Sequence, residues 1–66
     1  MQIQVNGEQR EIASGATVAQ LIDELQFDPR YLAVELNREL VPRAEHGGQR
    51  LAEGDKLEVV TLVGGG

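Results

Sequence analysis

The stretch MQIQVNG, residues 1–7, decides the fold. Apolar and polar residues alternate up to Val5, with the period of two that is typical of a half-buried strand. Asn6-Gly7 follows, and this pair strongly favours a tight hairpin because both residues tolerate a positive φ angle. We therefore expect residues 8–13 to return as a second strand, antiparallel to the first, before the chain turns at residues 14–16.

A single helix is predicted after this hairpin. Thr17 and Gln20 have the spacing of a capping box, in which each side chain bonds a backbone N–H at the other position. The apolar residues that follow fall on one helical face: Val18, Leu21, Ile22 and Leu25. Asp28-Pro29 is expected to end the helix, because proline bars its continuation. Phe27 and Tyr31, the two aromatic residues, are expected to close the end of the core.

Three further strands are predicted in the second half of the chain. Residues 32–36 alternate, and Asn37-Arg38 turns the chain into a short strand, residues 39–41, that Pro42 ends. Residues 43–53 are polar and irregular, and His46 among them is expected to be a solvated side chain. After a turn at Gly54-Asp55, residues 56–63 form the last and most hydrophobic strand.

The predicted order of elements is hairpin, helix, strand, short strand and final strand. One helix cannot cover both faces of a sheet, so it packs across one face of a mixed sheet of four to five strands, with the first and last strands as the central pair. This α+β arrangement is the β-grasp, or ubiquitin-like, architecture. We expect one β-grasp domain over residues 1–63, followed by a flexible glycine tail, residues 64–66.

The composition argues against several classes of protein. A chain of 66 residues is near the lower limit for independent folding and leaves little room for a buried catalytic pocket. It has no cysteine and one histidine, so thiol nucleophiles, zinc sites and His-centred triads lack their residues. Eleven acidic against six basic residues argue against nucleic-acid binding, and no apolar run approaches the ~20 residues of a membrane helix. We expect a soluble cytoplasmic protein, monomeric when free, that binds no metal.

The glycine tail, Gly64-Gly65-Gly66, is the candidate functional site. Glycine has no Cβ and can enter a narrow slot, and three extended residues span about 10 Å. A terminal carboxylate carried that far can reach a partner's active site, where the partner must activate it because this chain has no plausible nucleophile–base pair. We therefore predict a carrier or tag rather than an enzyme. The alternative is that the glycines are a frayed end or a cloning scar.

The outer face of the last strand is the candidate docking surface for partners. Alternation places Leu57, Val59 and Thr61 on the face that the helix covers. Glu58, Val60 and Leu62 then lie on the uncovered face, where two aliphatic side chains begin an exposed apolar patch beside the tail. Single exposed aliphatic residues are also ordinary on protein surfaces, which is the alternative interpretation.

Short motifs in a fixed order resemble one known family. They are Asn6-Gly7, Thr17-Val18-x-x-Leu21-Ile22, Asn37-x-Glu39-x-Val41-Pro42-Arg43, the stretch GDKLEVV over residues 54–60, and the ending Val63-Gly64-Gly65-Gly66. In this order and at these spacings the whole chain resembles the ThiS family of bacterial sulfur-carrier proteins. His46 departs from the pattern, since relatives often carry an aromatic residue there.

The resemblance implies a specific chemistry. An E1-like, ThiF-like adenylyltransferase uses ATP and Mg²⁺ to adenylate the carboxylate of Gly66. Sulfur from a cysteine desulfurase persulfide then displaces AMP and leaves a thiocarboxylate, which the carrier presents to a ThiG-like thiazole synthase. Gly64 and Gly65 are implied to pass into each partner's site, and the carrier itself binds no cofactor. Three alternatives remain: the small subunit of molybdopterin synthase, a ubiquitin-like modifier of lysines, and a plain binding module.

Overall fold

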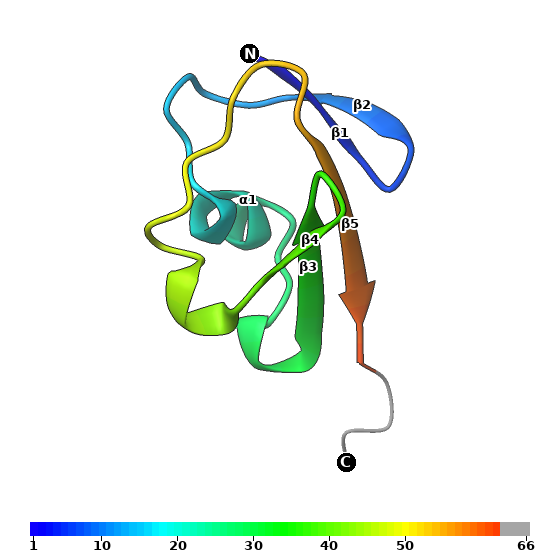
Figure 1. Cartoon of the computed structure of the whole chain (residues 1–66), viewed down its shortest axis with the longest axis vertical. Helices are drawn as coiled ribbons and strands as arrows, with labels where there is room; N and C mark the ends of the chain where they lie inside the picture. The colour runs from blue at the N-terminus through cyan, green and yellow to red at the C-terminus, as the bar shows by residue number, and fades with distance from the viewer. Residues whose placement is uncertain (63–66) are drawn as a thin grey trace.

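The computed structural model describes residues 1–62 and contains one α-helix against one sheet (Figure 1). The strands are β1 (Gln2–Val5), β2 (Glu8–Glu11), β3 (Leu32–Leu36), β4 (Glu39–Val41) and β5 (Lys56–Thr61). The helix α1 (Val18–Glu24) follows β2, and two 3₁₀ turns, η1 (Pro29–Tyr31) and η2 (Arg43–Glu45), precede β3 and follow β4.

The sheet has the strand order β2-β1-β5-β3-β4, with α1 on one face (Figure 1). β1 and β5 pair in parallel at the centre, and the other neighbouring strands pair antiparallel. This mixed five-stranded sheet with one helix confirms the predicted β-grasp fold. We call the sheet face that α1 leaves uncovered the open face.

Two tight turns with positive φ angles make the hairpins. Asn6 and Gly7 have φ angles of 51° and 83° between β1 and β2, and Asn37 and Arg38 have φ angles of 51° and 73° between β3 and β4. Positive φ at both central residues is the hairpin geometry that matches the twist of the flanking strands. The Asn-Gly prediction is confirmed, and the second turn accepts an arginine in a conformation that favours glycine.

The capping box at the start of α1 is confirmed. The backbone N–H of Thr17 donates to Gln20 Oε1 at 2.8 Å, and the N–H of Gln20 donates to Thr17 Oγ1 at 3.2 Å. The loop after η2 satisfies the next donors, because Val18 N–H donates to the carbonyl of Gln49 and Ala19 N–H to that of His46. The N-terminus of α1 is therefore fully paired within the fold.

The end of α1 differs from the prediction. The helix stops at Glu24, well before Pro29, because Gln26 adopts a φ angle of 61°. The N–H of Gln26 donates to the Asp23 carbonyl, and the N–H of Phe27 donates to the Ile22 carbonyl. These are the two hydrogen bonds of a Schellman motif. Pro29 instead opens η1. Gln26, in its left-handed conformation, therefore ends α1 before the chain reaches Pro29.

The core lies between α1 and the sheet. Its fully buried side chains come from both layers: Ile3, Val18, Leu21, Val34 and Leu57. Phe27 and Tyr31 do not close the core as predicted, since 39% and 46% of their surfaces remain exposed. The Schellman turn and η1 carry these two aromatic residues toward the surface.

His46 is buried, and the prediction of a solvated side chain was wrong. Only 5% of its surface is exposed, because η2 folds the 43–49 loop against the start of α1. His46 Nε2 lies 3.1 Å from the Val41 carbonyl oxygen, which can only accept, so Nε2 is the donor in this hydrogen bond. His46 Nδ1 is buried and has no hydrogen-bond partner among residues 1–62.

Candidate functional site

The central strand β5 leads to the glycine tail, and the two asparagine turns hold it. Asn6 Oδ1 accepts from the N–H of Val59 at 2.7 Å, and Asn6 Nδ2 donates to the carbonyl of the same residue at 3.1 Å. At the first residue of the strand, Asn37 Oδ1 accepts from the N–H of Lys56 at 3.0 Å. Each turn residue thus supplies a side chain where a further strand residue would bond. The two turns therefore hold β5 at its first residue and near its middle.

The open face of β5 carries the predicted docking residues. Glu58, Val60 and Leu62 are exposed, with 57% and 54% of the surface of the two aliphatic side chains accessible. Leu57 and Val59 are buried under α1, as the alternation predicts. Thr61 follows the same alternation but is exposed, since it is the last residue of the strand. The positions of the three residues agree with the prediction, and their role in docking stays a prediction.

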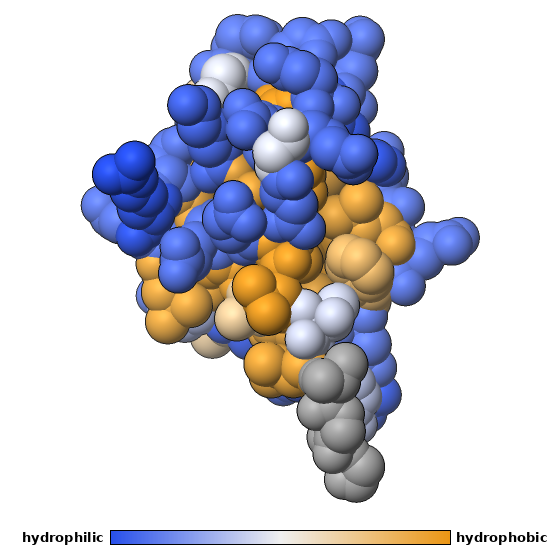
Figure 2. All heavy atoms as spheres, turned by 90° about the vertical axis from the view of Figure 1, so that its right-hand side faces the viewer, coloured by the Kyte–Doolittle hydropathy of each residue, from blue (hydrophilic) through white to orange (hydrophobic). Residues whose placement is uncertain are grey.

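The neighbouring strands extend this surface. The register sets Ala33 of β3 opposite Val60, and sets Glu35 opposite both Glu58 and Leu40 of β4. Leu40 has 66% of its surface exposed. Figure 2 shows apolar side chains gathered in the lower part of this face, with polar side chains above them. These β3 and β4 residues were missed, although the alternation of residues 32–36 already separates Ala33 and Glu35 from the buried Leu32 and Val34.

The end of β5 is supported by η1. The N–H of Leu62 donates to the carbonyl of Tyr31 at 2.6 Å. Within this turn, the Arg30 guanidinium bonds the carboxylate of Asp28 at 2.7 Å and lies 5.2 Å from the centre of the Tyr31 ring. The side-chain and backbone hydrogen bonds from Arg30 lower the pKa of Asp28 from 3.8 to about 2, and Asp28 raises the pKa of Arg30. The ion pair between Asp28 and Arg30, which we call the clasp, therefore stabilises η1, whose Tyr31 carbonyl bonds Leu62.

The glycine tail itself lies outside the described residues, as does Val63. Gly64, Gly65 and Gly66 therefore remain predictions as site residues, together with the domain boundary after residue 63. The predicted docking residues lie toward the end of β5, from which the tail continues in the sequence.

Other parts of the described chain supply little chemistry. A cavity of about 280 Å³ lies between α1 and the 43–47 loop, with Ile22, Phe27, Arg43 and His46 among its lining residues. Among residues 1–62, no group of three or more His, Cys, Asp or Glu side chains could hold a metal ion. No helix in this part of the chain is long and apolar enough to cross a membrane.

A single helix across a mixed five-stranded sheet, with a parallel central pair, defines a protein of the ubiquitin-like β-grasp class. The model of the ThiS family matches residues 3–66, which include the whole glycine tail. The chain belongs to the ThiS family.

Three known proteins show the range of this similarity. The chain is 29% identical to the sulfur carrier protein ThiS of Escherichia coli (strain K12) over 66 residues, which is 100% of both chains. It is 42% identical over all 66 residues to the thiazole synthase of Paramagnetospirillum magneticum, but spans only 20% of the length of that protein. The crystal structure of the thiamine biosynthesis protein ThiS of Geobacter metallireducens superposes with a TM-score of 0.85, at 30% identity and 100% coverage of both chains.

Proposed function

We propose that this chain is a sulfur carrier of thiamine biosynthesis and that the carboxylate of Gly66 is the group that carries the sulfur. The observation that carries the proposal is the ThiS family match, which runs through Gly66. Two further similarities support it: the alignment with the Escherichia coli sulfur carrier spans both chains, and the Geobacter metallireducens structure has the same fold.

The chemistry requires two activations that partners supply. A carboxylate oxygen of Gly66 attacks the α-phosphorus of ATP, with Mg²⁺ on the phosphates, and pyrophosphate leaves. A persulfide derived from cysteine then attacks the carbonyl carbon of the acyl-adenylate and AMP leaves. A thiol cleaves the resulting S–S bond, which forms a disulfide and leaves the thiocarboxylate. In this proposal the partners supply the catalytic groups, and the chain is a protein substrate and not an enzyme.

In this proposal, two parts of the described fold have separate roles. The fixed strand β5 directs Gly64 and Gly65 into a partner's active site, and the docking surface of Glu58, Val60 and Leu62 places the body of the carrier outside that site. The hydrogen bonds from Asn6 and Asn37 to β5 support this division, because a strand that is already held in place loses less conformational freedom on docking.

The partners in this proposal are a ThiF-like adenylyltransferase and a ThiG-like thiazole synthase. The thiazole synthase has direct support, because a thiazole synthase from Paramagnetospirillum magneticum contains a segment similar to this whole chain. A cysteine desulfurase supplies the persulfide through the adenylating partner. The carrier acts in the cytoplasm, where ATP is available, and is monomeric when free.

Two other functions use the same fold and tail. The small subunit of molybdopterin synthase forms a lasting complex with a larger subunit, and a ubiquitin-like modifier is joined to lysines of other proteins. The match to the ThiS family favours the thiamine carrier over both. Stable co-purification with a pterin-handling subunit would instead support the first rival, and an isopeptide-linked lysine the second.

Exchange of radiolabelled pyrophosphate into ATP tests the activation step. The ThiF-like adenylyltransferase of the same organism is mixed with the wild-type carrier, with a variant that lacks Gly66, or with the control Glu39→Gln. We expect exchange with the wild type and the control, and loss of exchange without Gly66, because the carboxylate then sits one residue short. Undiminished exchange without Gly66 would contradict the assignment.

A further inference from the structure

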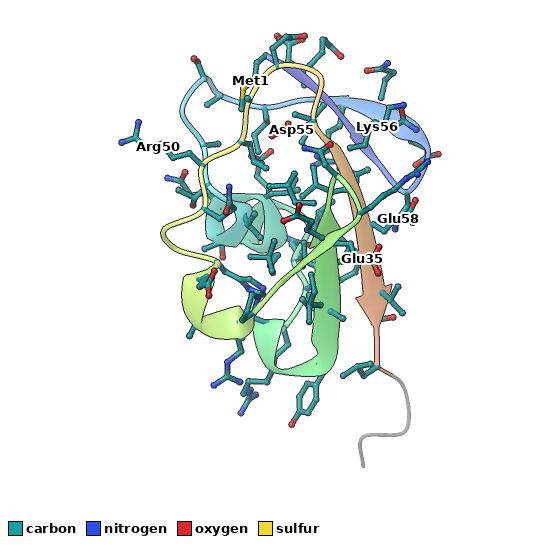
Figure 3. All side chains as sticks on the ribbon, in the orientation of Figure 1. Met1, Glu35, Arg50, Asp55, Lys56 and Glu58 are labelled. Atoms are coloured by element: carbon teal, nitrogen blue, oxygen red, sulfur yellow. The ribbon has the colours of Figure 1, made fainter. Side chains whose placement is uncertain are left out.

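Two glutamates lie directly opposite each other on the open face. The register of β3 and β5 pairs Glu35 with Glu58, and both side chains are exposed (Figure 3). Directly opposed side chains in antiparallel strands have their Cβ atoms about 4.5–5.5 Å apart, and like charges at that spacing destabilise the pair. The sheet therefore holds two negative charges side by side at its centre.

No cation of the described residues forms an ion pair with either glutamate. The ion pairs found among residues 1–62 are Arg10–Glu24 and Arg30–Asp28, and neither includes Glu35 or Glu58. Lys56 lies on the same face of β5, two residues before Glu58, yet it forms no ion pair in this part of the chain. Neither glutamate of the pair therefore has an ion-pair partner within the described fold.

Apolar side chains border the glutamate pair. Leu40 stands opposite Glu35 on β4, and the opposed residues Ala33 and Val60 form the next row toward the end of β5. Leu40 and Val60 have 66% and 57% of their surfaces exposed. A partner that covers these side chains excludes water beside the glutamates, and charge interactions strengthen when water is excluded.

We propose that Glu35 and Glu58 together receive one arginine side chain of the thiazole synthase, set among apolar side chains that cover Leu40 and Val60. This inference rests on the proposed function for the identity of the partner and adds the chemistry of its contact. A guanidinium has five N–H donors in one plane and can bond two carboxylates at once, whereas the three donors of an ammonium lack that fixed fork.

The arrangement explains why two like charges stand opposite each other at this position. In the free carrier they repel, and in the complex a single cation relieves the repulsion and gains two charge-assisted hydrogen bonds. A partner surface without a cation at this point would leave both carboxylates desolvated and unpaired, which costs affinity. The glutamate pair therefore favours partners whose apolar surface carries a cation at this point over partners whose apolar surface does not.

The test measures affinity for the thiazole synthase of the same organism by calorimetry, with Glu35→Gln, Glu58→Gln and the double variant. The matched control is Glu39→Gln, which removes the same charge from β4 at a position paired with Leu36 and remote from Glu58 in the register. We expect each single variant to weaken binding about tenfold and the control to change it less than about twofold. The double variant should lose less than the product of the single losses, because both glutamates serve one cation.

Thermal unfolding separates this role from a structural one. Removing one of two opposed like charges should leave the melting temperature of the free carrier unchanged or higher. Affinity losses equal to that of the control, fully multiplicative losses, or a lowered melting temperature would each overturn the proposal. If wild-type carrier does not bind the synthase at all, the proposal fails, while pyrophosphate exchange at Gly66 tests the carrier function independently.

Discussion

The side chain of Asn6 bonds both backbone groups of Val59, its Oδ1 at 2.7 Å from the nitrogen and its Nδ2 at 3.1 Å from the carbonyl oxygen. Asn6 belongs to the first hairpin turn and Val59 to β5, so the contact joins segments far apart in the sequence. It continues the pairing of β1 with β5 beyond Val5 and Leu57, the last pair of that register. One turn residue thus has two tasks, to adopt a positive φ angle and to bond the strand that leads to the glycine tail.

Replacing Asn6 by glycine tests this double role. Glycine keeps the positive φ angle but leaves the N–H and carbonyl of Val59 without the side-chain bonds, so we expect a loss of about 1–3 kcal/mol in the free energy of unfolding. Urea denaturation measures it. The control is Arg38→Gly in the other hairpin turn, where φ is 73° and the side chain makes no hydrogen bond among the described residues. That variant should retain or gain stability, and equal losses in both would show that glycine alone destabilises the turns.

Gln26 offers a stabilising substitution. It occupies the left-handed position after α1, where φ is 61°, and most helices with this Schellman ending place glycine there. Gln26→Gly should raise the free energy of unfolding by about 0.5–1 kcal/mol, because it removes the Cβ strain of the left-handed conformation. A scan of thermal unfolding measures the change. A lowered melting temperature would show that the Gln26 side chain contributes contacts that outweigh the strain.

Val60→Asp separates docking from folding. Val60 has 57% of its surface exposed on the open face, so an aspartate there remains solvated and should change the free energy of unfolding by less than about 1 kcal/mol. The same change at Val59, which is 6% exposed, should unfold the protein because it buries a charge. We expect Val60→Asp to raise the KM of the carrier for the adenylyltransferase about tenfold or more. An unchanged KM would remove Val60 from the docking surface.

The clasp between Asp28 and Arg30 should be visible in the acid titration of the Asp28 carboxyl. Hydrogen bonds from Arg30 lower the pKa of the Asp28 carboxyl to about 2, from 3.8. Because the folded-state pKa is depressed, the contribution to stability is present above pH 3.8 and is lost as the pH falls toward 2. Carbon NMR of the Asp28 carboxyl should show a midpoint near pH 2, and Arg30→Gln should move it toward 3.8. A midpoint near 3.8 in the wild type would contradict the clasp.

Most of the fold could be predicted because its determinants are local. The Asn6-Gly7 turn, the Thr17–Gln20 capping box and the alternation along β3 and β5 each depend on neighbouring residues, and the structure confirms all of them. The end of α1 could not be placed correctly because Gln26 is not a residue type that signals a left-handed turn. His46 was misjudged because its burial depends on how η2 returns to α1, a contact that no local pattern encodes.

In the candidate site, too, features that depend on one strand could be predicted, and features that depend on strand pairing could not. The exposure of Val60 and Leu62 follows from alternation within one strand, which the sequence displays. The opposition of Glu35 and Glu58 depends on the register between β3 and β5, which are separated by the whole of β4 and the loop after it. Likewise, the bonds from Asn6 to Val59 require the parallel pairing of the two ends of the chain. Cross-strand chemistry therefore had to come from the structure.

The mass of the carrier purified from its native host tests the central claim most directly. Replacing one carboxylate oxygen by sulfur adds about 16 Da, and digestion should locate the increment on the C-terminal fragment that contains Gly66. We predict a population with this added mass in the wild type and none in a variant without Gly66. Added mass on another fragment, or thiazole synthesis that continues without Gly66, would contradict the claim that this carboxylate carries the sulfur.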